Sequence, residues 1–162
     1  MKRFILVLLM VLSLILSTCG EYESTLQREF GFDVSNFTVL QENDSHGGFL
    51  GDGVYYITLD CSNNVDKARD IASSWKALPF SEGLNACMYG GEFNGVNYSA
   101  LVDKAYFPKV ENGVYKFLDR YSSEYVANRE DETLFLTRRS YNFSVAIYDF
   151  DADCLYYFEI DT

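Results

Sequence analysis

The sequence is poor in histidine, proline and tryptophan, and it lacks the common catalytic and metal-binding motifs. It contains one histidine, His46, two prolines and one tryptophan. No two of its four cysteines form a CxxC pair, which excludes a zinc ribbon and a thioredoxin-type motif. A GxSxG elbow, an HExxH helix, a P-loop and a glycine-rich dinucleotide turn are also missing. We therefore expect no metal and no cofactor.

Positive charge is also scarce. The chain has 13 basic and 24 acidic residues, a formal net charge of −11. Loss of Lys2 and Arg3 with an N-terminal signal would leave 11 basic residues against 24 acidic ones, a net charge of −13. Such a charge repels phosphate backbones and anionic lipid headgroups, which argues against nucleic acid as a partner.

The sequence has a single long apolar run, and it lies at the N-terminus. Lys2 and Arg3 precede the run Phe4–Leu16, and polar residues follow it. The run is shorter than the roughly 20 residues that a membrane-spanning helix needs. This pattern is typical of a secretory signal, so we predict that residues 1–18 are a signal peptide and that the chain is exported.

The end of the signal predicts how the exported domain is held. Leu16-Ser17-Thr18-Cys19 resembles the lipobox of bacterial lipoproteins, in which the cysteine becomes the first mature residue and carries lipid. Thr18 stands where that family usually has Gly or Ala, so ordinary cleavage and secretion stay open. From this resemblance we predict a lipid anchor at Cys19. Buried acyl chains bind membranes durably, so the domain would stay on the extracytoplasmic face of the cell membrane.

The rest of the chain is long enough for one domain with its own core. We assign residues 19–31 to an anchored segment with a short helix, and residues 32–162 to a single globular domain. If Cys19 carries lipid, an odd number of cysteines remains. Cys61, Cys87 and Cys154 can then form one bridge, or they are small buried side chains.

The spacing of apolar residues predicts two helices. Tyr22–Phe30 has apolar residues four apart and is followed by Gly31. A second helix begins at Asn63 or Asn64, carries an apolar stripe as far as Trp75 and is stopped by Leu78-Pro79.

Alternation of apolar and polar residues predicts an antiparallel sheet. Asn94-Gly95 and Asn112-Gly113 suit tight hairpin turns, and the second would join residues 105–110 to 114–118, with Pro108 marking an edge strand. Arg120–Thr133 is polar and predicts an exposed loop or a weak helix. The expected fold is α+β, with about two helices packed on one face of the sheet. The expected strands or extended segments cover residues 36–41, 54–61, 84–89, 105–110, 114–118, 142–147 and 154–160.

The segment Asp44–Gly53 is the most unusual in the chain, because it combines the only histidine with two carboxylates and four glycines. Glycines let a backbone turn tightly or approach a ligand closely, so the segment can be a simple turn or a ligand-binding loop. A carboxylate could also orient His46 as a general base. The candidate ligand-binding residues are Asp44, His46, Gly47, Gly48 and Asp52, and the catalytic candidates among them are His46, Asp44 and Asp52.

The segment Asp149–Asp153 begins like a calcium-binding loop. Cys154 then stands where such a loop needs glycine, and Ile160 where it needs a bidentate glutamate. A hairpin turn, in which aspartates accept hydrogen bonds from their own backbone, is the better interpretation.

Several spaced motifs support a family resemblance. They are Asp44-x-His46-Gly47-Gly48-Phe49-x-Gly51-Asp52-Gly53, Trp75-x-x-Leu78-Pro79, and an ending that runs from Asn142-Phe143 through Leu155-Tyr156-Tyr157 to Asp161-Thr162. With these motifs the chain resembles a group of small uncharacterised proteins, many with lipoprotein signals, from anaerobic Gram-positive bacteria. The resemblance spans roughly residues 32–162. It implies export and a compact α+β domain, and it transfers no activity and no catalytic residue.

These features favour a non-enzymatic, membrane-anchored domain. We expect it to bind a protein, a peptide or a cell-envelope component through the Asp44–Gly53 loop and neighbouring aromatic residues. The alternatives are a small hydrolase or transferase with His46 as general base, and an immunity-type protein that neutralises a toxin. The first alternative requires a pocket at His46 with a carboxylate within hydrogen-bond reach.

Overall fold

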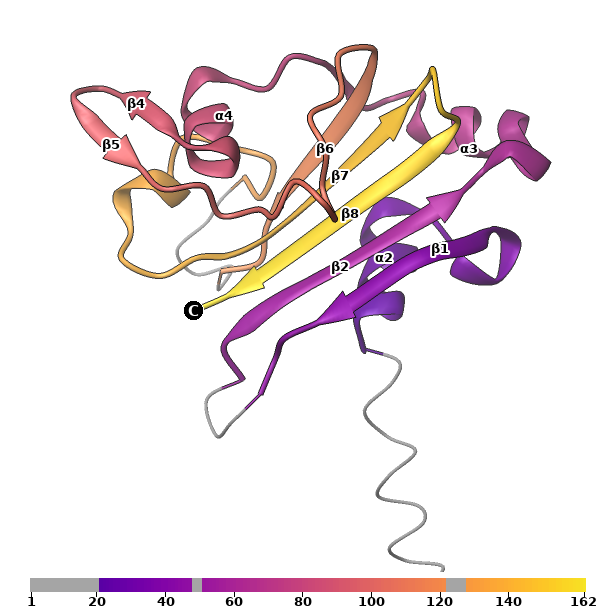
Figure 1. Ribbon diagram of the computed structural model, residues 1–162, viewed down its shortest axis with the longest axis horizontal. Coiled ribbons are helices and arrows are strands. Elements are labelled where there is room, and N and C mark those ends of the chain that lie inside the picture. The colour runs from indigo at the N-terminus through magenta and orange to yellow at the C-terminus, as the bar shows by residue number, and fades with distance from the viewer. Residues whose placement is uncertain (1–20, 48–50, 122–127) are drawn as a thin grey trace, which may run out of the picture.

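The computed structural model describes residues 21–47, 51–121 and 128–162, and it confirms the α+β class. Six antiparallel strands form the main sheet in the order β1-β2-β8-β7-β6-β3, and β4 and β5 form a separate two-stranded sheet (Figure 1). The strands are β1 (Thr38–Asp44), β2 (Gly53–Asp60), β3 (Lys76–Ala77), β4 (Gly91–Phe93), β5 (Val96–Tyr98), β6 (Gly113–Asp119), β7 (Asn142–Asp149) and β8 (Cys154–Asp161). The helices are α2 (Glu21–Phe30), α3 (Val65–Ala72) and α4 (Glu82–Tyr89), with 3-10 turns η1 (Val34–Asn36), η2 (Ser62–Asn64) and η3 (Phe135–Thr137).

Helices α2 and α3 cover one face of the sheet. Leu26 and Phe30 of α2 are buried there with Ala68 of α3, and they join Tyr55 and Tyr157 from the sheet in one core cluster. The two helices on one face are those that the sequence predicts. Gly31 ends α2 with a φ of +82°, a conformation that glycine adopts without strain.

Helix α4 and the β4–β5 hairpin cover the opposite face (Figure 1). Leu84 and Met88 of α4 lie in a second core cluster with Phe143 and Phe158 of the sheet. Successive strand residues point to opposite faces, so Tyr157 and Phe158 enter different clusters. The central strands are therefore buried on both sides.

The prediction of an extended segment over residues 84–89 is wrong, because these residues belong to α4. The hydroxyl of Ser81 caps this helix by accepting a hydrogen bond from the backbone N–H of Leu84 at 3.3 Å. Most of α4 is buried, and only Glu82 and Asn85 are polar, so its sequence shows too short a polar stripe to reveal a helical period.

The hairpin predicted at Asn112-Gly113 is also wrong. Residues 105–110 form no strand, Pro108 marks no edge strand, and β6 pairs with β7 instead. A Cβ atom on Gly113 would lie 2.3 Å from the carbonyl oxygen of Tyr148, so the glycine serves this close approach of two strands. At Asn94-Gly95 both residues have positive φ and join β4 to β5, as predicted.

The end of the second helix and the burial of the Arg120–Thr133 loop also differ from expectation. Helix α3 ends at Ala72, well before Pro79, and Lys76–Ala77 forms β3 against β6. Within the predicted exposed loop Arg120–Thr133, Glu132 is buried. Residues 122–127 of that loop lie outside the described residues, as do the predicted signal peptide and Cys19. Among the described helices, none is long and apolar enough to cross a membrane.

Candidate functional site

The β1–β2 hairpin brings Asp44 and His46 together, as the sequence suggested. His46 Nδ1 lies 2.7 Å from Asp44 Oδ1, and the backbone N–H of His46 donates to the same oxygen at 2.9 Å. A Cβ atom on Gly53 would lie 2.5 Å from His46 Cα, so glycine at this position lets the returning strand pass close to the histidine. The His46 side chain is only 8% exposed.

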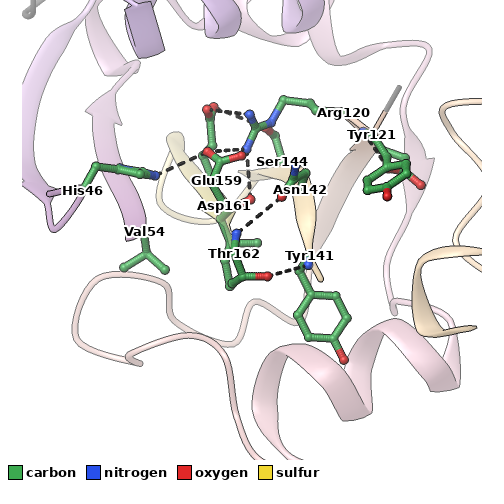
Figure 2. A network of polar contacts seen from close by, with 12 residues as sticks. His46, Val54, Arg120, Tyr121, Tyr141, Asn142, Ser144, Glu159, Asp161 and Thr162 are labelled. Atoms are coloured by element: carbon green, nitrogen blue, oxygen red, sulfur yellow. Dashed lines mark hydrogen bonds and ion pairs between the residues drawn. The ribbon is translucent and has the colours of Figure 1, made fainter. Parts of the chain in front are cut away.

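A second carboxylate, which the sequence did not indicate, lies on the other side of the imidazole. Asp161 Oδ2 is 3.3 Å from His46 Nε2 (Figure 2). Asp161 ends β8 and lies opposite Gly53 in the β2–β8 register. That register carries the C-terminal end of the chain to a loop more than a hundred residues earlier in the sequence.

Arg120, which follows β6, extends this arrangement into the protein. Its Nη2 donates to Asp161 Oδ2 at 3.0 Å, and its Nη1 lies 3.1 Å from Glu159 Oε1 (Figure 2). We call Asp44, His46, Arg120, Glu159 and Asp161 the His46–Arg120 cluster. It alternates carboxylates from β1 and β8 with His46, which follows β1, and Arg120, which follows β6.

Glu159 is the most buried member of the cluster, with a side chain 3% exposed. Burial raises the pKa of the Glu159 carboxyl, and the Arg120 guanidinium opposes that rise. The hydroxyls of Tyr157 and Ser144 donate to Glu159 as well. Burial also raises the pKa of the Tyr157 hydroxyl well above its usual value, which keeps this group protonated as a donor.

The geometry of the cluster fits a structural role, in which polar contacts join His46 to the end of β8, better than a role as general base. A base needs a nitrogen that faces its substrate, whereas both nitrogens of His46 face carboxylates of the protein. His46 lines none of three clefts found in the described part of the chain. The cluster holds the β1–β2 loop against the end of β8.

The remaining candidates from the sequence lie apart from this cluster. Gly47 and Asp52 are exposed, and Gly48 lies outside the described residues. Asp149 accepts from the backbone N–H groups of Asp151 and Ala152, as expected of a hairpin turn. In the described ranges no three His, Cys, Asp or Glu side chains come together as a metal site would require.

The cysteines within the described ranges are free thiols. Cys61 and Cys87 are buried, and Cys154 is half-buried. Burial raises the pKa of Cys61 to about 12 and that of Cys87 to about 11. Thiols of this kind are poor nucleophiles at neutral pH and behave as small apolar side chains.

A groove on the α4 face is the site that the sequence did not reveal. It lies between the start of α4, the β4–β5 hairpin and the segment around η3, and its volume is about 540 Å³. Apolar side chains form much of its wall, among them Phe93, Leu136 and the 52%-exposed Val96. The full lining is Ser81, Glu82, Gly83, Phe93, Asn94, Val96, Tyr98, Glu132, Thr133, Leu136 and Thr137.

Glycine at position 83 sets how closely the groove walls approach each other. A Cβ atom there would lie 2.6 Å from Leu136 Cδ1 and 3.1 Å from Phe93 Cε1. The groove is thus assembled from three separate segments, residues 81–83, 93–98 and 132–137. No short motif spans them, and only the predicted Asn94-Gly95 hairpin gave any signal of one wall.

Comparisons with known proteins leave the site to be interpreted from its own geometry. Searches against protein-family models, curated proteins and solved structures found no match to this chain. The fold defines a small α+β domain with helices on both faces of an antiparallel sheet.

Proposed function

We propose that the protein is an exported, lipid-anchored binding domain that holds a segment of a peptide or protein ligand in the α4 groove. The observation that carries this proposal is the groove itself. Its volume lies in the range of small-ligand sites, and its wall combines apolar surface with a few polar groups, as such sites usually do. The proposal therefore assigns the ligand to the α4 face instead of the Asp44–Gly53 loop that the sequence suggested.

The proposed anchor is compatible with access to the groove. In the sequence, Cys19 lies two positions before Glu21, the first residue of α2, and α2 packs on the sheet face opposite to α4. We therefore expect the membrane on the α2 side of the sheet and the α4 face open to solvent. The domain would bind its ligand at the membrane surface without embedding the groove.

The anchor predicts a specific mass. Intact protein from native membranes should have the mass of the chain from Cys19 onward plus its acyl groups. A Cys19→Ser variant should lack the acyl groups, because serine has no thiol to carry them. Mass spectrometry after detergent extraction checks this, and an unmodified Cys19 in the native protein would contradict the anchor.

The binding role predicts that peptides selected on the full-length protein will depend on the groove. We would select a random heptapeptide phage library on the immobilised protein and measure the affinity of enriched peptides by titration calorimetry. Val96→Lys places a long side chain in the groove and should weaken their binding by about tenfold or more, the effect of losing a central contact.

The matched control for Val96→Lys is Leu40→Lys. Leu40 lies on the edge strand β1, is 58% exposed and does not line the groove. Both variants add the same charge to an exposed aliphatic position, so only a groove ligand distinguishes them. Equal loss of binding in the two variants, or no enriched peptide at all, would count against the proposal.

A further inference from the structure

The charges in the groove indicate what kind of ligand it accepts. Two carboxylates, those of Glu82 and Glu132, line it, and none of the described residues in its wall is basic. The whole chain also carries a formal charge of −11. An anionic ligand would therefore meet repulsion both at a distance and at contact.

Glu132 is the carboxylate that is built into the wall. Its side chain is 7% exposed. Lys76 Nζ donates to its Oε1 at 2.7 Å, and the hydroxyl of Tyr115 donates to both oxygens at 3.0 and 3.2 Å. A carboxylate offers about four acceptor positions, so these two donors leave capacity for a third.

Tyr115 keeps Glu132 supplied with a donor over the whole physiological range. Burial is the main cause that raises the pKa of the Tyr115 hydroxyl, and the neighbouring Glu132 adds to it. Lys76 is 48% exposed and does not line the groove, and its ammonium pairs with Glu132 at 2.7 Å. Glu132 therefore receives its counter-charge from outside the groove, and the described wall itself supplies no positive charge to a ligand.

The apolar wall and the buried carboxylate together match one side-chain chemistry. Lysine and arginine carry an apolar stem and a charged tip, and they bury the stem while the tip seeks a partner. Phe93 and Leu136 can cover such a stem, and Glu132 can accept a hydrogen bond from the tip. Glu82, exposed at the rim, adds attraction without a buried contact.

We infer that the α4 groove recognises a cationic side chain, lysine or arginine, of an extended peptide segment. This inference rests on the proposed binding role of the groove and names the class of ligand. A purely apolar segment would lack the cationic donor from which Glu132 accepts a hydrogen bond.

The test uses two capped amino acids that differ in one group. N-acetyl-lysine methylamide carries the ammonium, and N-acetyl-norleucine methylamide has the same backbone and an apolar chain. Ligand-observed saturation-transfer NMR on the full-length protein should give a dissociation constant about tenfold lower for the lysine probe, as expected for a hydrogen bond to a charged group. Equal binding of both probes, or no binding of the lysine probe, would overturn the inference.

Variants assign the preference to Glu132. Glu132→Gln should abolish the difference between the probes, whereas Glu92→Gln, which removes an exposed charge on β4 outside the groove, should preserve it. If Glu132→Gln does not fold, Glu82→Gln replaces it and should reduce the preference without touching a buried contact. A preference unchanged in both groove variants would also overturn the inference.

The outcomes separate the inference from the proposed function. Enriched peptides that lack a basic residue but depend on Val96 would overturn the cationic ligand and leave the binding role in place. A lysine probe that binds through Glu132, with no peptide enriched by selection, would instead support the ligand class and contradict the peptide-binding role.

Discussion

Replacing Arg120 by methionine is expected to destabilise the protein by about 3 kcal/mol at neutral pH, the typical cost of removing one partner from a buried ion pair. Arg120 contacts two carboxylates, and Glu159 is almost completely buried. Methionine has a similar length and no charge. The variant would leave Glu159 charged in the interior with only the hydroxyls of Tyr157 and Ser144 as donors.

The loss should shrink as the pH falls. Burial raises the folded-state pKa of Glu159 above its ordinary value of 4.5. Between that ordinary value and the raised one, the folded state binds more protons than the unfolded state, so stability decreases as pH rises through this window. Removal of Arg120 raises the folded pKa further. In acid Glu159 is protonated and neutral, so the loss of the Arg120 charge lowers the free energy of unfolding by less. The variant should therefore be closest to wild type in acid.

Urea unfolding, followed by tryptophan fluorescence at about pH 5 and about pH 7.5, checks both expectations. Arg139→Met is the matched control, because Arg139 is an exposed arginine three residues before β7. The start of β7 pairs with the end of β6, which Arg120 follows. It should change the free energy of unfolding by less than about 0.5 kcal/mol. An Arg120→Met loss that is as small as the control, or that grows in acid, would show that the cluster does not hold a buried charge.

The sequence predicted the elements whose side chains alternate or repeat in a regular way. In β2 and β8 the residues on either side of the pleat enter different cores, so the alternation that marks a strand survived even with both faces buried. Helix α2 was predicted because its apolar residues lie four apart and Gly31 follows them. In each case the local pattern and the tertiary packing require the same residues.

Prediction failed where tertiary contacts set the local structure. Helix α4 has only a short polar face, formed by Glu82 and Asn85, because the sheet and the neighbouring segments bury most of its other residues. Gly113 looked like a turn residue but is needed where a strand passes the carbonyl of Tyr148. Neither feature can be distinguished from its alternative without knowing what packs against it.

The candidate site shows the same division. Asp44 and His46 are two residues apart, so a contact between them could be predicted from sequence, and the structure shows it. Asp161 reaches the same histidine only through the pairing of β2 with β8, and Arg120, at the end of β6, joins the cluster through Asp161. The α4 groove combines residues 81–98 with the distant segment 132–137, which explains why the prediction placed the ligand on the glycine-rich loop instead.

The groove also depends on the aromatic core beneath it, and Phe143 is the residue through which that dependence can be measured. Phe143 is 0% exposed and contacts the rings of Phe117, Phe135 and Phe158 at centroid distances of 5.4, 5.0 and 6.0 Å. Phe135 begins η3, whose next two residues line the groove. A cavity at position 143 would therefore remove support from one wall of the proposed site.

Phe143→Ala is expected to lower the free energy of unfolding by about 4 kcal/mol, because the surrounding rings can close only part of the space that the phenyl group leaves. That loss is a large fraction of the stability of a typical domain. Phe150→Ala is the matched control: Phe150 is half-buried, packs on the opposite face and should cost roughly 1 kcal/mol. Urea unfolding measures both losses.

Probe binding is measured at a urea concentration and temperature at which both variants are folded. The lysine probe should bind the Phe143→Ala protein more weakly than it binds the Phe150→Ala protein, because η3 has lost its buried contact. If Phe143→Ala loses stability but binds the probe as well as wild type, the groove wall is held by α4 and the β4–β5 hairpin and does not depend on the aromatic core.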